Sequence, residues 1–437
     1  MKILMLGWEY PPHIAGGLGT ACEGLTRGLA RLGIDVTFVV PRLHGGEDAG
    51  HMTLTDPYQG GRSWTELEYG DISWDEEHLQ RLGIEAFLMP YWTEIEYKER
   101  LESVRHAASV LTGANVHVEP PPVAPSGRAH YGRDIFDEVA RYARNTVARV
   151  AGLEFDVIHA HDWMTYPAGI ALAELTGKPL VAHVHSLEYD RSGTHVNQRI
   201  HQVERAGLHR ANAVIAVSHY TKSVIHREHG VPLDKIHAVH NGIYPARAIE
   251  QYRAGHPEAP QHKVVLFLGR ITFQKGPDYF VRAAAKVVPH VPGVVFVMAG
   301  SGDMKGRMME LAETLGILEH FEFPGFLRGK EVEEMYNLAD LYVMPSVSEP
   351  FGISALEAIN FDVPTLISKQ SGVAEVVGNS LKFDFWDVDR LADLMINGLI
   401  HEELRADMTA MAKLELKNVR WDASASKTLE VYSGILH

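Results

Sequence analysis

Cysteine is nearly absent from this sequence, in which Cys22 is the single one among 437 residues. One cysteine forms no internal disulfide and provides no cluster of thiolates for zinc. A small domain built on disulfides and a cysteine-type zinc site are therefore excluded. A chain without disulfides suits a reducing compartment, and we expect a cytoplasmic protein.

The chain also lacks a long apolar run at its start. Its first seven residues are apolar apart from Lys2, and then Trp8, Glu9 and two prolines interrupt the run. Such a run is too short for a signal peptide or a membrane span, and we expect no stable insertion into a membrane. It is instead typical of a buried first strand.

Positive charge is in deficit, with 41 Lys and Arg against 56 Asp and Glu and a formal net charge of −15. This sign is wrong for a protein that binds nucleic acid or anionic membranes over a broad surface. We therefore expect no nucleic-acid partner. Any phosphate group that binds must meet a locally basic site.

Several chemical motifs are missing too. The 25 histidines are scattered along the sequence, whereas known zinc sites need clustered ligands, so no metal is expected. Neither Gly-x-x-x-x-Gly-Lys-Ser/Thr nor Gly-x-Ser-x-Gly occurs, which argues against a P-loop nucleotidase and against a serine hydrolase.

What is present is the composition of a folded globular chain, with 46% hydrophobic and 22% charged residues. The length favours two domains, with three as the alternative. Short apolar runs alternate with amphipathic stretches in both halves, which predicts βαβ units and parallel sheets. We predict strands at 2–7, 34–40, 85–89, 155–160 and 180–184 in the first half, and at 263–269, 293–299, 321–324, 340–345, 363–368 and 381–384 in the second.

The stretch 245–262 is polar and without periodicity, and a new strand begins at Lys263, so the domain linker is placed there. Two further stretches, 44–80 and 119–127, are rich in turn-forming residues and are predicted to be surface insertions. The predicted domains are 1–250, 251–420, and a final helix at 421–437 with Asp422 as its cap, which packs back on the first domain.

A glycine-rich turn follows the first strand. Thr20 and Glu23 match a capping box and Gly33 suits a helix end, which predicts a helix between them. The turn Gly16–Gly19 would then present backbone N–H groups at a helix N-terminus to a phosphate or a sugar. The pattern is not Gly-x-Gly-x-x-Gly, and a glycine turn alone is a weak signal.

Open α/β sheets bind ligands beyond the carboxyl ends of their strands, so the candidate residues are those of the βα loops. Arg270 and Lys275 lie in one such loop, before a helix that starts near Pro277. This loop can aim two cations and a helix N-terminus at one pyrophosphate. The alternative is two solvated surface cations, and the spacing alone does not decide.

Two acids follow the predicted strand at 340–345. Glu349 lies in the loop and Glu357 one to two turns into the next helix, so both can face one elongated polar ligand. Carboxylates accept hydrogen bonds from sugar hydroxyls. The alternative is a helix-capping acid and a solvated helix residue.

In the first half, polar residues end two apolar strands. Asp162 follows one strand, and His183, His185 and Ser186 follow the next, with both histidines on the same strand face. Such residues are candidates to line a cleft. A single histidine is more often structural. His185, however, is expected at the same edge as the other candidate loops, which favours a functional role.

Together these segments resemble glycosyltransferase family 4 and its relatives, the bacterial glycogen and starch synthases. The resemblance covers nearly the whole chain and implies the GT-B fold, in which two Rossmann-like, doubly wound parallel-sheet domains face each other across a cleft. It rests on Gly16–Gly19, His161–Trp163, Val184–Tyr189, Arg270–Lys275 and Ser348–Glu357.

The resemblance also implies roles. In the second domain, Arg270 and Lys275 would neutralise the donor diphosphate, Glu349 would contact the donor sugar, and Glu357 would bind the ribose. His185 of the first domain would lie beside the sugar. The remaining positions would be Gly16, Gly17, Phe351, Gly352 and Ile353 at the donor, and Asp162 and Ser186 toward the acceptor.

The implied activity is retaining transfer of a sugar from a nucleotide donor to a carbohydrate acceptor. The preferred pair is UDP- or ADP-glucose and an α-1,4-glucan, with neither a cofactor nor a metal. No carboxylate is placed for the double displacement of retaining glycosidases, so we expect a front-face substitution in which the departing diphosphate takes the proton of the acceptor.

Alternatives follow from two departures, because Ile14 and Ser186 stand where glycogen synthases have lysine and asparagine. One alternative is a family 4 transferase with another sugar, or with a lipid or small-molecule acceptor. Another is an epimerase or phosphorylase on the same architecture, and a third is a non-catalytic protein that binds nucleotide sugars. The sequence sets no oligomeric state.

Overall fold

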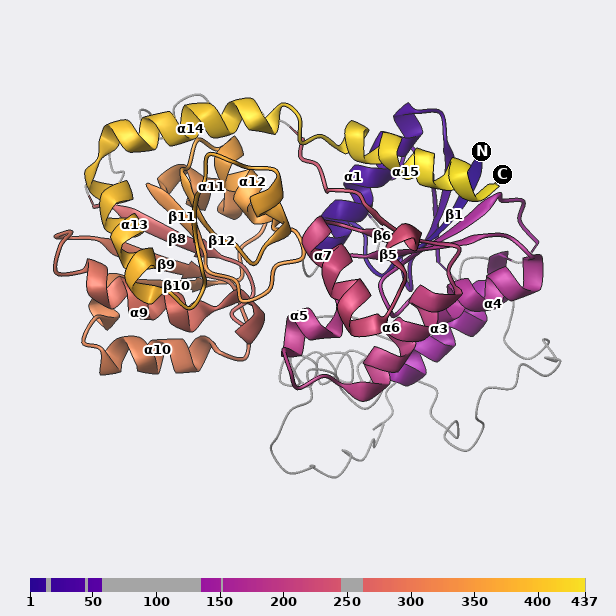
Figure 1. The fold of residues 1–437 in the computed structure, drawn as a ribbon, viewed down its shortest axis with the longest axis horizontal. Helices are drawn as coiled ribbons and strands as arrows, with labels where there is room; N and C mark the ends of the chain where they lie inside the picture. Colours follow the sequence, from indigo (N-terminus) through magenta and orange to yellow (C-terminus); the bar gives the residue numbers. More distant parts are fainter. Residues whose placement is uncertain (13–16, 44–45, 57–134, 151, 245–261, 437) are drawn as a thin grey trace, which may run out of the picture.

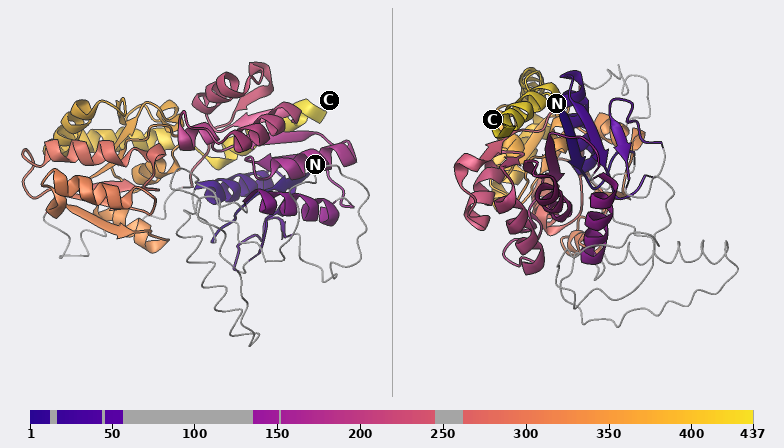
Figure 2. Two further views of the ribbon diagram at one scale, coloured as in Figure 1. Left: turned by 90° about the horizontal axis from the view of Figure 1, so that it is seen from below. Right: turned by 90° about the vertical axis from the view of Figure 1, so that its right-hand side faces the viewer.

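The computed structural model describes residues 1–12, 17–43, 46–56, 135–150, 152–244 and 262–436 (Figure 1). The predicted strand at 85–89, the loop at 119–127, Gly16 and nearly all of the predicted linker lie outside the described residues. Two parallel sheets form, one from each half of the chain, and Figure 2 shows the two halves side by side along the longest axis.

The first sheet has seven strands in the order β3-β2-β1-β4-β5-β6-β7. Every neighbouring pair is parallel, with Ile3 of β1 opposite both Val36 and Val157. The central strands are buried on both faces because helices cover both sides. The strands are β1 Lys2–Leu6, β2 Asp35–Val39, β3 Thr53–Thr55, β4 Val157–His161, β5 Leu180–Val184, β6 Ala213–Ala216 and β7 Ile236–Ala238. The helices are α1 Gly17–Arg31, α3 Ile135–Val150, α4 Tyr166–Thr176, α5 Glu188–Ser192, α6 Gln198–Arg210, α7 His219–Val224, the π-turn η2 Ile225–His229 and the 3₁₀ turn η3 Leu233–Lys235.

The second sheet has six parallel strands in the order β10-β9-β8-β11-β12-β13. They are β8 Val264–Leu268, β9 Val295–Ala299, β10 Phe321–Gly325, β11 Leu341–Met344, β12 Thr365–Ser368 and β13 Leu381–Phe383. The helices are α9 Pro277–Val287, α10 Lys305–Thr314, α11 Lys330–Leu338, α12 Ile353–Asn360, α13 Val388–Ile400, α14 Glu402–Leu416 and α15 Trp421–Leu436, with short turns η4 Phe273–Lys275, η5 Leu318–His320 and η6 Gly372–Glu375.

The strand order reverses between β1 and β4 in the first sheet and between β8 and β11 in the second. These switch points are where doubly wound sheets bind ligands. The predicted fold class is confirmed, and the predicted strands within the described residues are present to within two residues at each end. The short strands β3, β6 and β7 were not predicted, because three or four residues carry too little pattern.

The first helix begins earlier than the sequence suggests. α1 starts at Gly17, so Thr20 and Glu23 lie inside it and the capping-box interpretation is wrong. Glu9 supplies the acceptor instead, because its carboxylate accepts a hydrogen bond from the N–H of Gly19 at 3.0 Å. The predicted end is confirmed, since Gly33 follows the helix with a φ of +74°.

The last helix returns to the first domain. Figure 1 shows α14 over the second sheet and α15 beside α1. The contact is close because α1 has glycine there: a Cβ on Gly24 would lie 2.1 Å from the Trp421 ring. Asp422 is in the first turn of α15 and not at its cap as predicted, and it pairs with Arg31 at 2.7 Å. None of the helices in the described ranges combines the length and apolarity needed to cross a bilayer.

Candidate active site

The loop after β8 packs against the end of β11, across the switch point of the second sheet. Gly276 has a φ of +61°, and a Cβ there would lie 2.2 Å from the Pro345 carbonyl oxygen, so only glycine fits. This approach brings Lys275 to Glu349, and the two form an ion pair. Ser346 donates a hydrogen bond to the same Glu349 oxygen at 3.1 Å. Two predicted residues, 74 positions apart, therefore meet in one largely buried pair.

Arg270 lies at the start of the same loop, and its guanidinium donates a hydrogen bond to the side-chain carbonyl of Gln274 at 3.0 Å. Gln274 is buried, and its backbone carbonyl accepts from the N–H of Val347 at 2.9 Å. Gln274 was not predicted from the sequence, yet it links the loop of the two cations to the loop of Glu349.

The backbone beyond Glu349 turns sharply into α12. Gly352 has a φ of +108°, and a Cβ there would lie 3.1 Å from both Met344 and Val373. Phe351 is buried beside it. Ile353, the first residue of α12, comes within 4.0 Å of a Cβ built on Gly17, so the N-termini of α12 and α1 face each other from the two domains.

Glu357, the second predicted acid, is hydrogen-bonded to a tyrosine of α11. Its carboxylate accepts a hydrogen bond from the hydroxyl of Tyr336 at 3.0 Å. Burial raises the pKa of Glu357, which the Tyr336 hydrogen bond partly offsets. The two acids therefore have different partners, Lys275 for Glu349 and Tyr336 for Glu357.

Asp162 holds together the ends of two strands in the first domain. It follows β4 with an unusual φ of +58°, and its carboxylate accepts hydrogen bonds from the N–H of His185 at 2.7 Å and of Ser186 at 3.4 Å. Burial raises the pKa of Asp162 to about 7. The bonds position the backbone at the predicted histidine. Ser186 is buried, and its hydroxyl has no hydrogen-bond partner among the described residues.

His185 directly follows β5, is partly buried, and stacks with three buried histidines of β4 and β5. Its Nε2 is hydrogen-bonded to Nδ1 of His161 at 2.9 Å, and its ring stacks on His183 with centroids 4.2 Å apart. His159 is hydrogen-bonded through Nε2 to Nδ1 of His183 at 3.0 Å and through Nδ1 to the hydroxyl of Tyr432, in α15, at 2.5 Å. We call His159, His161, His183 and His185 the histidine stack.

Burial lowers the pKa of His159 and of His185 to about 3. The stack is therefore uncharged at neutral pH, and His185 acts there as a neutral hydrogen-bonding group. Histidines that are far apart in the sequence meet because alternate residues of neighbouring parallel strands share one sheet face.

The segment after His185 connects the two domains through Asp190, a residue that was not among the predicted site residues. Asp190 of α5 accepts hydrogen bonds from the N–H of Leu187 at 2.7 Å and from the hydroxyl of Ser348 at 2.5 Å. Ser348 is also hydrogen-bonded to the hydroxyl of Tyr220 at 2.9 Å. The residue next to Glu349 is thus held by two side chains of the first domain.

Other contacts join the same two edges. A Cβ on Gly193, which follows α5, would lie 3.2 Å from the Phe273 ring of η4. Ser218 donates a hydrogen bond to the Pro350 carbonyl at 2.6 Å, and Glu375 accepts from the N–H of Tyr220 at 2.7 Å. The loops after β5, β6, β8 and β11 therefore converge.

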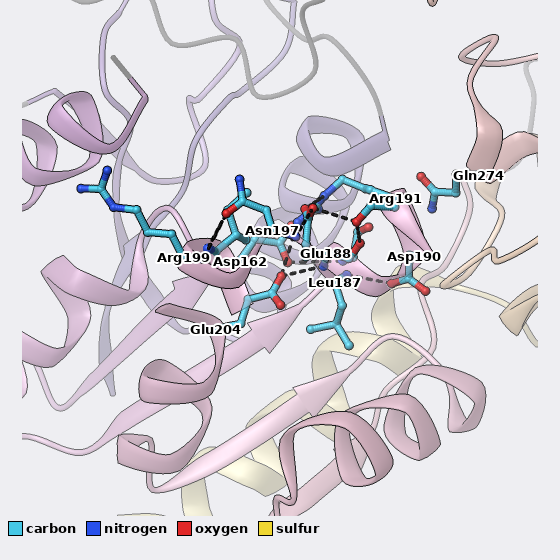
Figure 3. Close-up of polar contacts among 12 residues, drawn as sticks. Asp162, Leu187, Glu188, Asp190, Arg191, Asn197, Arg199, Glu204 and Gln274 are labelled. Atoms are coloured by element: carbon cyan, nitrogen blue, oxygen red, sulfur yellow. Dashed lines mark hydrogen bonds and ion pairs between the residues drawn. The ribbon is translucent and has the colours of Figure 1, made fainter. Parts of the chain in front are cut away.

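Buried charges hold α5 in shape (Figure 3). Glu204 of α6 accepts a hydrogen bond from the N–H of Glu188 at 2.8 Å and pairs with Arg191 at 3.3 Å. Arg191 also pairs with Glu188 at 3.3 Å, and all three side chains are buried. Figure 3 shows Asp190 and Arg191 on the side of this network that faces Gln274. The three charged residues Glu188, Asp190 and Arg191, which lie shortly after the buried strand β5, were the signal in the sequence that could have revealed this network.

Two doubly wound domains whose carboxyl edges meet, with a cation and an acid paired at one switch point and helix N-termini beside them, define a GT-B type of nucleotide-sugar enzyme. Comparison with known proteins agrees. Residues 76–247 match the family model described as Glycosyltransferase Family 4, and residues 248–415 match that of Glycosyl transferases group 1. The chain belongs to glycosyltransferase family 4 and is a glycosyltransferase.

Named relatives extend over most of the chain. It is 26% identical to a glycogen synthase of Mycobacterium tuberculosis, over 99% of this chain and 94% of that protein. It is 32% identical to the alpha-maltose-1-phosphate synthase of Mycolicibacterium smegmatis, over 63% of this chain and 78% of that protein. Sucrose-phosphate synthase of Thermosynechococcus elongatus shares the fold, with a TM-score of 0.72 at 18% identity, over 99% and 98% of the two chains.

Proposed function

We propose that this glycosyltransferase moves glucose from UDP- or ADP-glucose to an acceptor such as an α-1,4-glucan, with retention of configuration and without a metal. The observation that carries the proposal is the ion pair of Lys275 and Glu349 at the second sheet's switch point. The residue before Glu349, Ser348, is hydrogen-bonded to Asp190 of the first domain. Similarity to a glycogen synthase over almost the whole chain supports the glucan acceptor.

The donor diphosphate would bind between the loop of Arg270 and Lys275 and the N-termini of α1 and α12. Phosphate oxygens accept hydrogen bonds from N–H groups at helix ends, and a cation offsets the charge that develops as the sugar leaves. Glu349 keeps the Lys275 ammonium fixed in direction. Glu357, beside Tyr336, would receive the ribose.

The sugar would lie against His185. Since the histidine stack is uncharged, His185 would direct a sugar hydroxyl by a hydrogen bond without adding charge near the reacting carbon. Asp162 would set the position of His185 and Ser186 through their backbone N–H groups.

Retention by front-face substitution agrees with the pairing of the acids. Glu349 is bound to Lys275, and Asp162 is buried against two backbone donors, so neither is presented as a free nucleophile for a double displacement. The bond from the anomeric carbon to the diphosphate oxygen would break as the acceptor oxygen bonds on the same face. The departing phosphate oxygen would take the proton of the acceptor.

Nucleotide release tests the proposal. The full chain is incubated with UDP-, ADP- and GDP-sugars, each with glycogen or maltooligosaccharides and without added metal. Release that needs both a glucose donor and the glucan is expected, and NMR of the product should show a new α-linkage. Binding of a donor without turnover, or a β-linked product, would contradict the proposal.

A second candidate is transfer to a small phosphorylated acceptor. The relative that is 32% identical carries alpha-maltose 1-phosphate in its name, and Ser186 departs from the asparagine of glycogen synthases. Adding glucose 1-phosphate to the same panel separates the two, because the second candidate requires release with this acceptor and none with glucan.

A further inference from the structure

A cluster of side chains that the proposed sugar transfer does not use lies between α6 and η2 of the first domain. His201 and Glu204 are one turn apart on α6, so they share one face of that helix, and His229 ends the π-turn η2. One candidate ligand atom from each of the three lies within 4.8 Å of the other two.

The polar atoms of this cluster are buried without partners. Glu204 is 1% exposed and His229 is fully buried. Four atoms have no hydrogen-bond partner among the described residues: Oε2 of Glu204, Nδ1 of His201 and both ring nitrogens of His229. His229 Nε2 is 3.4 Å from Glu204 Oε2, within ion-pair range but without hydrogen-bond geometry. Buried polar atoms normally have partners, and a cation would satisfy three of these atoms at once.

The carboxylate of Glu204 is already oriented for such a role. Its Oε1 accepts the N–H of Glu188 at 2.8 Å and faces Arg191 at 3.3 Å, which leaves Oε2 toward the histidines. Hydrogen bonds of this kind fix the direction of a metal-binding carboxylate. His201 is partly exposed, so its ring can turn out of its stack on His229, where the centroids are 4.5 Å apart, and direct a nitrogen at the same point.

We propose that His201, Glu204 and His229 bind one Zn²⁺ ion, with water as the fourth ligand. Two imidazoles and one carboxylate are a set that zinc accepts in tetrahedral geometry. The ion joins α6 to η2 and, through Glu204, stiffens α5, which carries Asp190. The site touches neither donor nor acceptor, so the proposal is independent of the proposed substrates.

Other groups of candidate ligands in the described part of the chain are less suited. Within the histidine stack, ring nitrogens are already hydrogen-bonded to each other, as between His161 and His185. In the group of His219, His240 and Glu375, the carboxylate already accepts from two backbone N–H groups and from His240. The cluster at Glu204 has the largest number of unpartnered atoms.

Titration of the metal-free full chain with ZnSO₄ in a calorimeter tests the site. We expect one equivalent to bind and to raise the melting temperature, because a ligand that binds only the folded state stabilises it. His229→Gln and His201→Gln should each weaken binding by roughly tenfold or more. The matched control His240→Gln, in the group at Glu375, should bind zinc like the wild type.

Cobalt distinguishes this site from one that includes Cys22, which lies near His161 and His185. Co²⁺ bound to two histidines and a carboxylate gives visible ligand-field bands but no intense near-ultraviolet thiolate band. Metal-free melting curves and circular dichroism establish that each variant is folded, and partly exposed His201 provides the milder change. No stoichiometric zinc binding, unchanged binding in both variants, or a thiolate band would each overturn the proposal.

Discussion

The two domains differ in the charge of the side chains that they place at their shared edge. The first presents the histidine stack, in which burial removes charge and each ring is fixed by its neighbours. The second presents Lys275 and Glu349, which form an ion pair with each other. One switch point therefore supplies shape and hydrogen bonds, and the other supplies charge.

The difference follows from how the loops are built. β4 and β5 are adjacent parallel strands, so their alternate histidines stack on one face in a dry core. β8 and β11 end instead in loops at the carboxyl edge of the sheet. In the first of these loops Lys275 keeps 20% of its side chain exposed. A diphosphate needs a cation that a ligand can reach, and the second domain provides it.

The largest test of this division is Lys275→Ala. Loss of one preorganised charge at the leaving group typically lowers kcat by about a hundredfold or more, and the same loss is expected here. Steady-state rates of nucleotide release measure it. Lys286→Ala is the control, since Lys286 lies on the same domain but in an exposed pair with Asp389. Near-normal turnover by Lys275→Ala would show that the second domain does not act through the charge of Lys275.

The next test titrates the histidine stack. The pKa of His159 is lowered to about 3 in the folded chain, whereas it is about 6.5 in the unfolded chain. Between these two pH values the unfolded chain therefore binds a proton that the folded chain does not bind. The stabilisation is complete above pH 6.5 and is lost as the pH falls toward 3, by about 1.4 kcal/mol per pH unit for each such histidine. His159→Gln should flatten the dependence of the unfolding free energy on pH by about this amount.

Denaturant unfolding between pH 4 and 6.5 measures the slope, with exposed His195→Gln as the control. The raised pKa of Asp162, about 7, gives the opposite sign, because its carboxyl binds protons in the folded chain that it loses as the pH rises. The comparison is therefore between wild type and variant at each pH. Equal slopes would show that the stack carries charge when folded.

Much of the fold could be predicted because its signals are local. Runs such as Val264–Leu268 are apolar throughout, which predicts a strand buried on both faces. The start of α1 was predicted wrongly because its acceptor, Glu9, comes from a separate loop. A hydrogen-bond acceptor that comes from outside the helix leaves no spacing pattern in the helix sequence.

The candidate site divides in the same way. Lys275 and Glu349 were predicted from their motifs, and the structure pairs them, while their roles in transfer stay predictions. Asp190, Gln274 and Glu204 were missed, because each acts through contacts across the fold with residues far away in sequence or with backbone atoms. Spacing shows which residues share a loop, whereas packing decides which loops meet.

The smallest expected effect concerns the contact between the domains. Ser348→Ala removes the hydroxyl that bonds Asp190 at 2.5 Å and Tyr220 at 2.9 Å, next to Glu349. The net contribution of one intramolecular hydrogen bond is typically about 1 kcal/mol. We expect kcat/KM for the donor to fall roughly fivefold, since 1.4 kcal/mol is a factor of ten.

A double-mutant cycle decides whether this contact joins the charged and uncharged halves of the site. Asp190→Asn keeps an acceptor for Ser348 and should lower kcat/KM less than Ser348→Ala does. The double variant should show less than the sum of the two effects, because both remove one interaction. Ser223→Ala, exposed on α7, is the control. Additive effects would mean that the two domains contribute to transfer without coupling through Ser348 and Asp190.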